Sequence, residues 1–336
     1  MRPDFRNRVR NLQKLIKRNR LGAAMLTDPS DIFYYTGLDT DDSAFLVVDT
    51  DSSKPKLFVS PLNNNAEGLK TADVSFLRDL KEIRDLLKRY GPVGFDERNL
   101  NVHVFSRLRQ GTDLRPACCV IREPRMVKDS YELRQIRKAV GITLGILGEL
   151  GTGGKTELEI AAEIENRTRE AGLCSAFPPI VSSGKNSFFI HTKPTKRRIK
   201  SSDLVILDMG VRYNGYCSDI TRTLCLRPDK RQKKIMEDIS LVQGEIIGSI
   251  KDGAGFNEIE GLYEKLMEKH GYRVFHSFGH GIGLSPHERP LKGDVLREGM
   301  VLTVEPGVYI RNFGGCRIED MILVKRNRAE VLSTRV

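Results

Sequence analysis

Two predicted β-hairpins in the C-terminal half of the chain each carry two carboxylates, and this pattern limits the possible folds most strongly. The first hairpin turns at Asn214-Gly215, a favoured two-residue hairpin turn. If these two residues form the whole turn, Gly210 faces Asp219, and Asp208 is a diagonal neighbour of Asp219 on the same face. Their backbone positions are then about 7–8 Å apart, close enough for the two carboxylates to share an ion.

The second predicted hairpin repeats this arrangement. Apolar strands over 301–305 and 317–324 flank a loop that we place at 311–315. This loop makes Glu305 and Glu319 diagonal neighbours on one face. An unpaired charge beside an apolar run is costly, so a cation, either arginine or a metal ion, is expected to balance these carboxylates.

A glycine-rich segment, residues 276–290, contains three of the six histidines in the chain, His276, His280 and His287. Its glycines allow the backbone to approach a ligand closely. A fourth histidine, His191, follows an apolar run. A lone histidine is more often structural, but three in one such segment favour a functional site.

Four carboxylates and an imidazole form a mixed oxygen and nitrogen donor set. Such a set suits two divalent cations, as in two-metal hydrolases. Two bridged cations would also acidify a shared water and supply hydroxide near neutral pH.

The remaining patterns predict two domains, 1–122 and 123–336, with the boundary at a charged, proline-containing segment. The first third alternates helices and strands, which favours an α/β domain. The rest predicts an α+β domain with an antiparallel sheet and no convincing internal repeat. The principal predicted helices cover about 5–20, 79–90, 130–150, 157–171, 230–251 and 257–270.

The net charge of +11 raises the question of nucleic-acid binding. Eight basic side chains fall within residues 1–20, but apolar residues recur there at helical spacing from Phe5 to Ile16. We interpret the charge as the solvated face of a helix, because no nucleic-acid-binding motif accompanies it. A second basic cluster, residues 193–200, lies near the candidate site in sequence and would attract anionic groups.

The sequence predicts a cytoplasmic protein without membrane association. No apolar run reaches the roughly 18 residues of a membrane-spanning helix, and no signal peptide is recognised. Six cysteines without a CxxC pair indicate neither a zinc knuckle nor a disulfide framework.

At these residues the sequence resembles the pita-bread metallopeptidases, and more closely their Xaa-Pro branch, proline dipeptidase (prolidase) and aminopeptidase P. Residues 21–27 and 34–38 look like the N-terminal domain of that branch, and 125–133 looks like the start of its catalytic domain. The resemblance covers essentially the whole chain. It implies a creatinase/prolidase-like α/β domain followed by a pita-bread α+β domain with a curved antiparallel sheet.

The resemblance also implies a ligand set for two divalent ions, which in the family are manganese, cobalt or zinc. These ligands are Asp208, Asp219, His280, Glu305 and Glu319. Asp219 and Glu319 would bridge the ions, and Glu305 would also act as the general base.

Further site residues follow from the same resemblance. His191 and His287 match histidines that bind substrate and stabilise the tetrahedral intermediate. The other matches are a pocket histidine, an aromatic wall for the substrate proline, and an arginine and a tyrosine beside the metal carboxylates: His276, Phe177, Arg317 and Tyr309.

The implied activity is hydrolysis of the Xaa-Pro bond by a metal-bridging hydroxide, with dipeptides as the expected substrates. A small peptide with proline in second position would bind a homodimer, since in relatives the partner's N-terminal domain limits substrate length. Aminopeptidase P, which acts on longer peptides, is the alternative. Methionine aminopeptidase, creatine-cleaving relatives and a non-catalytic binding module on the same fold are less favoured, because the long N-terminal domain, His191 and all five ligands are present.

Overall fold

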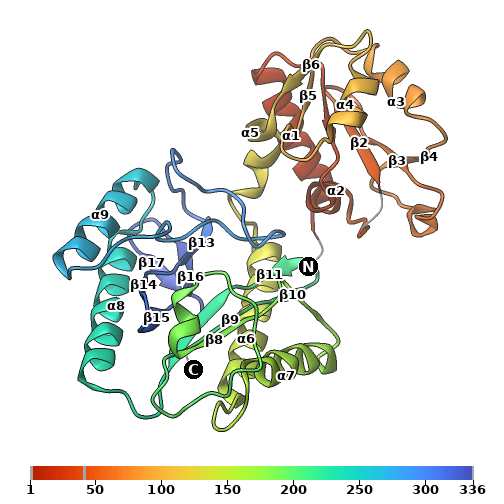
Figure 1. Ribbon diagram of the computed structural model, residues 1–336. Coiled ribbons are helices and arrows are strands. Elements are labelled where there is room, and N and C mark those ends of the chain that lie inside the picture. Colours follow the sequence, from red (N-terminus) through yellow and green to blue (C-terminus); the bar gives the residue numbers. More distant parts are fainter. Residues whose placement is uncertain (1–2, 41–42, 335–336) are drawn as a thin grey trace. The chain divides into compact units, whose positions relative to one another are not determined.

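The computed structural model describes residues 3–40 and 43–334. The chain divides into two compact units, Met1–Arg125 and Met126–Val336 (Figure 1). Each unit has its own buried hydrophobic residues, and the clusters around Ile83 in the first unit and around Ile160 and Ile239 in the second do not cross between the units. All the residues of the candidate site belong to the second unit.

The first unit contains a six-stranded mixed sheet of order β4-β3-β2-β1-β5-β6. Strand β1 pairs antiparallel with β2 and parallel with β5, so the predicted α/β class is confirmed. The strands are β1 Ala23–Leu26, β2 Ala44–Asp49, β3 Lys56–Val59, β4 Asp73–Phe76, β5 Val93–Phe95 and β6 Leu114–Pro116. The helices are α1 Phe5–Arg18, α2 Pro29–Thr36, α3 Leu80–Leu87, α4 Val102–Leu108 and α5 Cys118–Arg122, with short 3₁₀ turns η1 Asn64–Ala66 and η2 Glu123–Arg125.

Helix α1 buries the apolar stripe that its sequence predicts, with Val9, Leu12 and Ile16 against the sheet and its neighbouring helices. Arg8, expected on the solvated face, is instead buried. Its guanidinium donates a hydrogen bond to the Tyr34 carbonyl at 3.0 Å and lies 4.1 Å from the Tyr34 ring centre. The stem and cation of this arginine are therefore used for packing.

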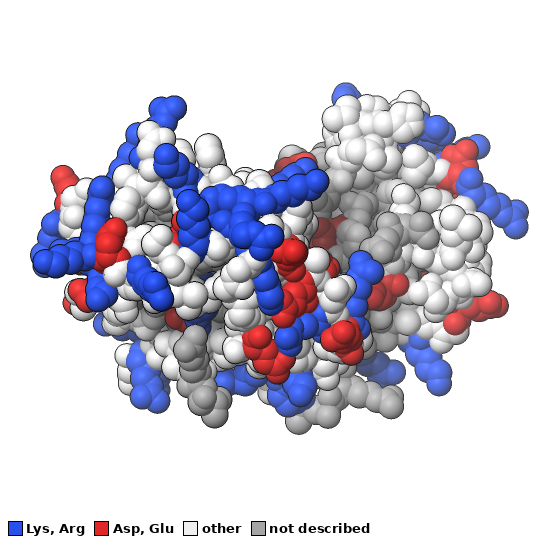
Figure 2. All heavy atoms as spheres, turned by 60° about the horizontal axis from the view of Figure 1, so that its bottom comes forward, with Lys and Arg blue, Asp and Glu red and all other residues white. Residues whose placement is uncertain are grey.

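The excess positive charge is interspersed with acidic side chains on the face shown in Figure 2. Lys and Arg side chains form several groups there, and Asp and Glu side chains lie between them. Among the residues that the structure describes, no helix is both long and apolar enough to cross a membrane.

The second unit combines helices with antiparallel strand pairs, which confirms the predicted α+β class. Its helices are α6 Ser130–Glu149, α7 Glu157–Glu170, α8 Lys230–Ser249 and α9 Phe256–Lys269, with a 3₁₀ turn η3 at Gly184–Phe188. Its strands are β7 Cys174–Ser175, β8 Ile180–Ser183, β9 Val205–Met209, β10 Val211–Tyr213, β11 Tyr216–Cys217, β12 Ile220–Leu224, β13 Val301–Val304, β14 Gly307–Ile310, β15 Gly314–Arg317, β16 Asp320–Val324 and β17 Ala329–Val331.

This unit is built from two successive halves of similar construction. A 20-residue helix and a 14-residue helix, α6 and α7, precede β7 to β12, and helices of the same two lengths, α8 and α9, precede β13 to β17. One hydrophobic cluster joins α6 and α7 to β8, β9 and β10, and another joins α8 and α9 to β13, β14 and β16. The sequence showed no convincing repeat, so this regularity becomes visible only in the structure (Figure 1).

A buried carboxylate in the middle of α8 joins this helix to the C-terminal end of α9. Asp238 accepts hydrogen bonds from Lys234 Nζ at 2.6 Å and Tyr272 OH at 2.8 Å, and His270 Nδ1 lies 3.0 Å from it. Burial opposes the charge on Asp238, but its hydrogen bonds outweigh this effect and lower its pKa.

Candidate metal centre

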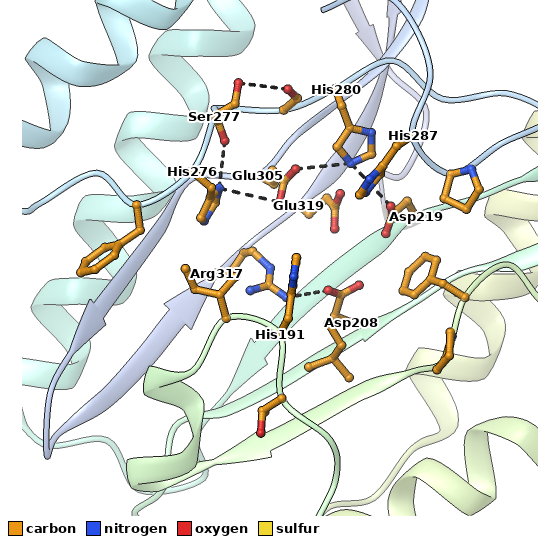
Figure 3. Close-up of a pocket in the computed structure, with 18 of the residues that line it drawn as sticks. His191, Asp208, Asp219, His276, Ser277, His280, His287, Glu305, Arg317 and Glu319 are labelled. Atoms are coloured by element: carbon orange, nitrogen blue, oxygen red, sulfur yellow. Dashed lines mark hydrogen bonds and ion pairs between the residues drawn. The ribbon is translucent and has the colours of Figure 1, made fainter. Parts of the chain in front are cut away.

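A cavity of about 1360 Å³ opens in the second unit, and both predicted hairpins contribute to it. Figure 3 shows carboxylates, histidines and one arginine converging on it from different strands and loops. Ten of the eleven predicted site residues line this cavity: Phe177, His191, Asp208, Asp219, His276, His280, His287, Glu305, Arg317 and Glu319. The eleventh, Tyr309, contacts two of them from behind.

The predicted register of the first hairpin is confirmed. Asn214 and Gly215 both have positive φ angles, 48° and 86°, as a two-residue turn of this kind requires. Tyr213 therefore pairs with Tyr216, and the same register continues along β9 and β12. The strands are interrupted beside Asp219, which lies in the gap between β11 and β12.

The predicted register of the second hairpin is wrong by two positions. Ile310 pairs with Gly314, so the turn spans only residues 311–313, with Asn312 in the left-handed region at φ 65°. Val304 pairs with Asp320 on one side and Gly307 pairs with Arg317 on the other. This register places Glu305 directly opposite Glu319 rather than diagonally. The two carboxylates are thus closer in register than the sequence suggested.

Three buried carboxylates form the centre of the site. One oxygen each of Asp208, Asp219 and Glu319 lies within 4.8 Å of the others. Asp208 Oδ1 is buried without a hydrogen-bond partner among the described residues, whereas Glu319 Oε2 accepts a 2.7 Å hydrogen bond from Thr221. Burial and then mutual repulsion raise the pKa values of Asp219 and Glu319 well above their usual range.

Glu305 completes the acidic set at the more open side. Burial raises the pKa of Glu305 to about 7, with Arg317 opposing the shift and Asp208 adding to it. So much negative charge in one place requires compensating cations.

Arg317 supplies one positive charge from within the chain. Its guanidinium donates to Asp208 Oδ2 at 2.5 Å and to Tyr309 OH at 2.8 Å, and only 2% of the residue is exposed. One guanidinium cannot neutralise four carboxylates, so capacity for further cations remains.

His280 is oriented to offer a lone pair to this centre. Its Nδ1 lies 3.1 Å from the Gly281 carbonyl, so a neutral ring carries its proton there. Nε2 then faces Glu305 at 3.4 Å and Asp219 at 3.8 Å. Burial, followed by the neighbouring His287, lowers the pKa of His280 to about 4 and favours the neutral form.

The other histidines surround the carboxylates. The His287 ring centre is 4.1 Å from that of His280, and His276 Nε2 lies 3.0 Å from Tyr309 OH. Burial lowers the pKa of both His276 and His287. His191 enters from the loop after η3 and lies beside Asp208 and Arg317 in Figure 3.

Sequence reasoning missed several residues of the cavity. Glu260 of α9 lines it and accepts hydrogen bonds from Ser277 Oγ at 2.7 Å and the Phe278 amide at 3.3 Å, which holds the His276–His280 segment. Lys292 also lines the cavity, as does Lys193 from the basic cluster noted in the sequence. Only the fold brings Glu260 and Lys292 to the site, because neither belongs to a local motif.

The donor set fits divalent metal ions. It offers four carboxylates and one neutral imidazole, and Asp208 Oδ1 is a buried acceptor that nothing in the described chain satisfies. Oxygen-rich sites with one imidazole suit divalent cations, and bound cations would reverse the repulsion that raises the carboxylate pKa values.

Comparison with known proteins identifies matches to both units. Residues 134–326 match the model of metallopeptidase family M24, and residues 8–127 match the creatinase/prolidase N-terminal domain. A Xaa-Pro dipeptidase of Pyrococcus furiosus is 31% identical over 98% of both chains.

Solved structures agree with these matches. The prolidase of Pyrococcus horikoshii OT3 has a TM-score of 0.90 at 29% identity, covering 98% of this chain and 99% of that one. An X-Pro aminopeptidase of Thermotoga maritima has a TM-score of 0.87 at 25% identity, covering 98% of both chains.

Proposed function

The chain belongs to metallopeptidase family M24, and we propose that it is the Xaa-Pro dipeptidase of this family, a metal-dependent exopeptidase that hydrolyses dipeptides ending in proline. The observation that carries the proposal is the convergence of four carboxylates and the Nε2 side of His280 on one cavity. Residues 123–336 would supply the catalytic machinery.

Two divalent cations, either manganese, cobalt or zinc, would occupy the centre. Asp219 and Glu319 would be shared between the cations, Asp208 would hold one, and His280 with Glu305 would hold the other. When bound, such ions lower the pKa of a coordinated water and polarise a carbonyl oxygen.

The chain's own residues would guide the proton and the developing charge. Glu305 would accept the proton of the attacking water and return it to the proline nitrogen as the peptide bond breaks. His191 and His287 would donate hydrogen bonds to the substrate carbonyl oxygen as it becomes negative. Arg317, itself bonded to Tyr309, would hold Asp208 in place, and His276 would complete the pocket wall.

Proline recognition follows from the shape of the cavity. The Xaa-Pro amide has no N–H, and its ring fixes φ near −65°, so the site must accept a rigid ring and need not bind an amide proton. Phe177, with Pro178 beside it, forms an apolar wall for this ring. Lys193 and Lys292 would attract the free carboxylate of a dipeptide, which supports the preference for dipeptides.

The size of the cavity and the likeness to an X-Pro aminopeptidase favour aminopeptidase P activity as the second candidate. Hydrolysis of Leu-Pro and of Leu-Pro-Gly by metal-stripped protein, before and after addition of each metal, separates the two. Cleavage of the dipeptide alone, restored by metal, is the expected result. Cleavage of the tripeptide would assign aminopeptidase P. No cleavage after addition of any of the three metals, by a protein that also purifies without stoichiometric metal, would assign a binding module.

The cellular location and the oligomeric state of the enzyme belong to the same proposal. We place it in the cytoplasm as a homodimer. The absence of any disulfide among its six cysteines, all of which the structure describes, suits a reducing compartment. Light scattering coupled to size-exclusion chromatography tests the dimer.

A further inference from the structure

A buried carboxylate outside the metal centre holds both ends of the loop that carries His191. Glu157 is the first residue of α7 and is 0% exposed. It accepts hydrogen bonds from five donor groups on three residues: Ser183 N at 2.8 Å and Oγ at 2.7 Å, Asn186 Nδ2 at 3.2 Å, Thr195 N at 3.0 Å and Oγ1 at 2.6 Å.

The two carboxylate oxygens divide these donors by position along the chain. Oε1 accepts both hydrogen bonds from Ser183, before the loop, and Oε2 accepts both from Thr195, after it. Asn186 Nδ2 lies 3.2 Å from each oxygen. Glu157 therefore fixes the two ends of the segment 184–194, which contains η3 and His191 (Figure 3).

Backbone contacts add to the attachment on the downstream side. The amides of Glu157 and Leu158 donate to the carbonyls of Arg197 and Thr195, both at 3.1 Å. The carboxylate also lies at the N-terminus of a 14-residue helix, where the helix dipole favours a negative charge. An acidic side chain is thus stable at this buried position.

The His191 ring depends on this loop for its position. In the part of the chain that the structure describes, the ring has no hydrogen-bond partner of its own, and the residue is exposed at the cavity. Its placement is therefore set by the backbone of 184–194.

We infer that Glu157 is a positioning residue for catalysis, which fixes the ends of the 184–194 loop so that His191 points into the metal-site cavity. The inference rests on the role proposed above for His191. Misplacing a catalytic group by about 1 Å can cost on the order of 100-fold in rate.

The test is a double-mutant cycle between Glu157→Gln and His191→Ala, measured as kcat/KM for Leu-Pro with saturating metal. Glutamine keeps the side-chain shape but presents an NH₂ group to donors that need an acceptor. We expect Glu157→Gln to lower kcat/KM by roughly 10- to 100-fold in the wild-type background, mainly through kcat. In the His191→Ala background the same change should cost less than about 2-fold, because there is no imidazole left to misplace.

Two further variants keep the test decisive. Glu163→Gln is the matched control and should leave kcat/KM unchanged. Glu163 lies on the same helix, and its hydrogen-bond partners among the described residues are Lys155 and Arg167. Thr195→Val removes one donor at the downstream end and should show the same dependence on His191 with a smaller loss, even if Glu157→Gln folds poorly.

An equal loss in both backgrounds would overturn the inference and assign Glu157 a general structural role. Hydrogen–deuterium exchange gives a readout that does not need activity. Glu157→Gln should accelerate exchange in 187–194 while β9 stays protected, and unchanged exchange in that loop would also overturn the inference. If the wild-type protein cleaves no Xaa-Pro bond, the proposed function fails, but the exchange experiment still tests whether Glu157 holds the loop.

Discussion

Replacing Arg317 with methionine should destabilise the metal-free protein far more than the metal-bound protein. Arg317 is buried and is the cation bonded to Asp208, whose other oxygen already has no partner in the described chain. The substitution leaves the Asp208 carboxylate buried without compensation. Removing one partner of a buried ion pair typically costs about 3–5 kcal/mol.

This cost translates into a large shift in melting temperature. For a domain of this size, 1 kcal/mol corresponds to about 2–4 °C, so Arg317→Met should lower the Tm of the metal-stripped protein by roughly 6–20 °C. Divalent cations held by Asp208 and its neighbours would supply the missing positive charge. With saturating manganese, the loss should therefore fall to less than about half of that value.

Thermal unfolding of both proteins, with chelator and with manganese, measures the two shifts. Arg197→Met is the matched control, because Arg197 forms a two-point ion pair with Asp203 away from the carboxylate cluster. Its Tm loss should be the same with and without metal. If the Tm loss of Arg317→Met is also the same with and without metal, a bound cation does not compensate the charge of Asp208.

Three other substitutions test separate parts of the structure. The pKa of Asp238 is lowered in the folded state, so its stabilisation is present above the unfolded value near 4 and disappears as pH falls through the folded value. Asp238→Asn should cost about 2 kcal/mol of stability at pH 7, and the Tm difference from the wild type should shrink as the pH falls below about 4. A Tm difference that stays constant through the acid range would contradict this. A Cβ on Gly279 would lie 2.0 Å from the Thr303 carbonyl oxygen, so Gly279→Ala should cost about 1–3 kcal/mol and lower the bound metal measured by elemental analysis. Phe177→Ala should raise KM for Leu-Pro about 10-fold with little change in kcat, because roughly 1.5 kcal/mol of apolar contact is lost. The control Phe76→Ala, at an exposed position in the first unit, should leave KM unchanged.

Local sequence signals predicted most of the helices and the first hairpin correctly. The Asn214-Gly215 turn fixes its register because both residues adopt positive φ angles, and no tertiary contact is needed to read this. The second hairpin shows where such reading fails. Gly314 and Gly315 looked like loop residues, but both belong to β15.

These glycines are required by packing rather than by a turn. A Cβ on Gly315 would lie 2.2 Å from the Ser187 carbonyl, because η3 crosses closely over β15. No local pattern encodes a contact between residues 128 positions apart. The same reason explains why Glu157 and Glu260 escaped notice: their partners lie far along the chain or in segments without a motif.

The division of the second unit into two halves has a consequence for how metal supply controls the protein in the cell. The first half contributes Asp208 and Asp219, and the second contributes His280, Glu305 and Glu319. A cation bound to residues of both halves exists only while the halves are docked. By mass action, metal at about 100 times its dissociation constant then adds about 2.7 kcal/mol to the docked state. When metal is scarce, the protein would therefore lose its activity and would also be degraded faster by proteases. Its abundance and its activity would fall together.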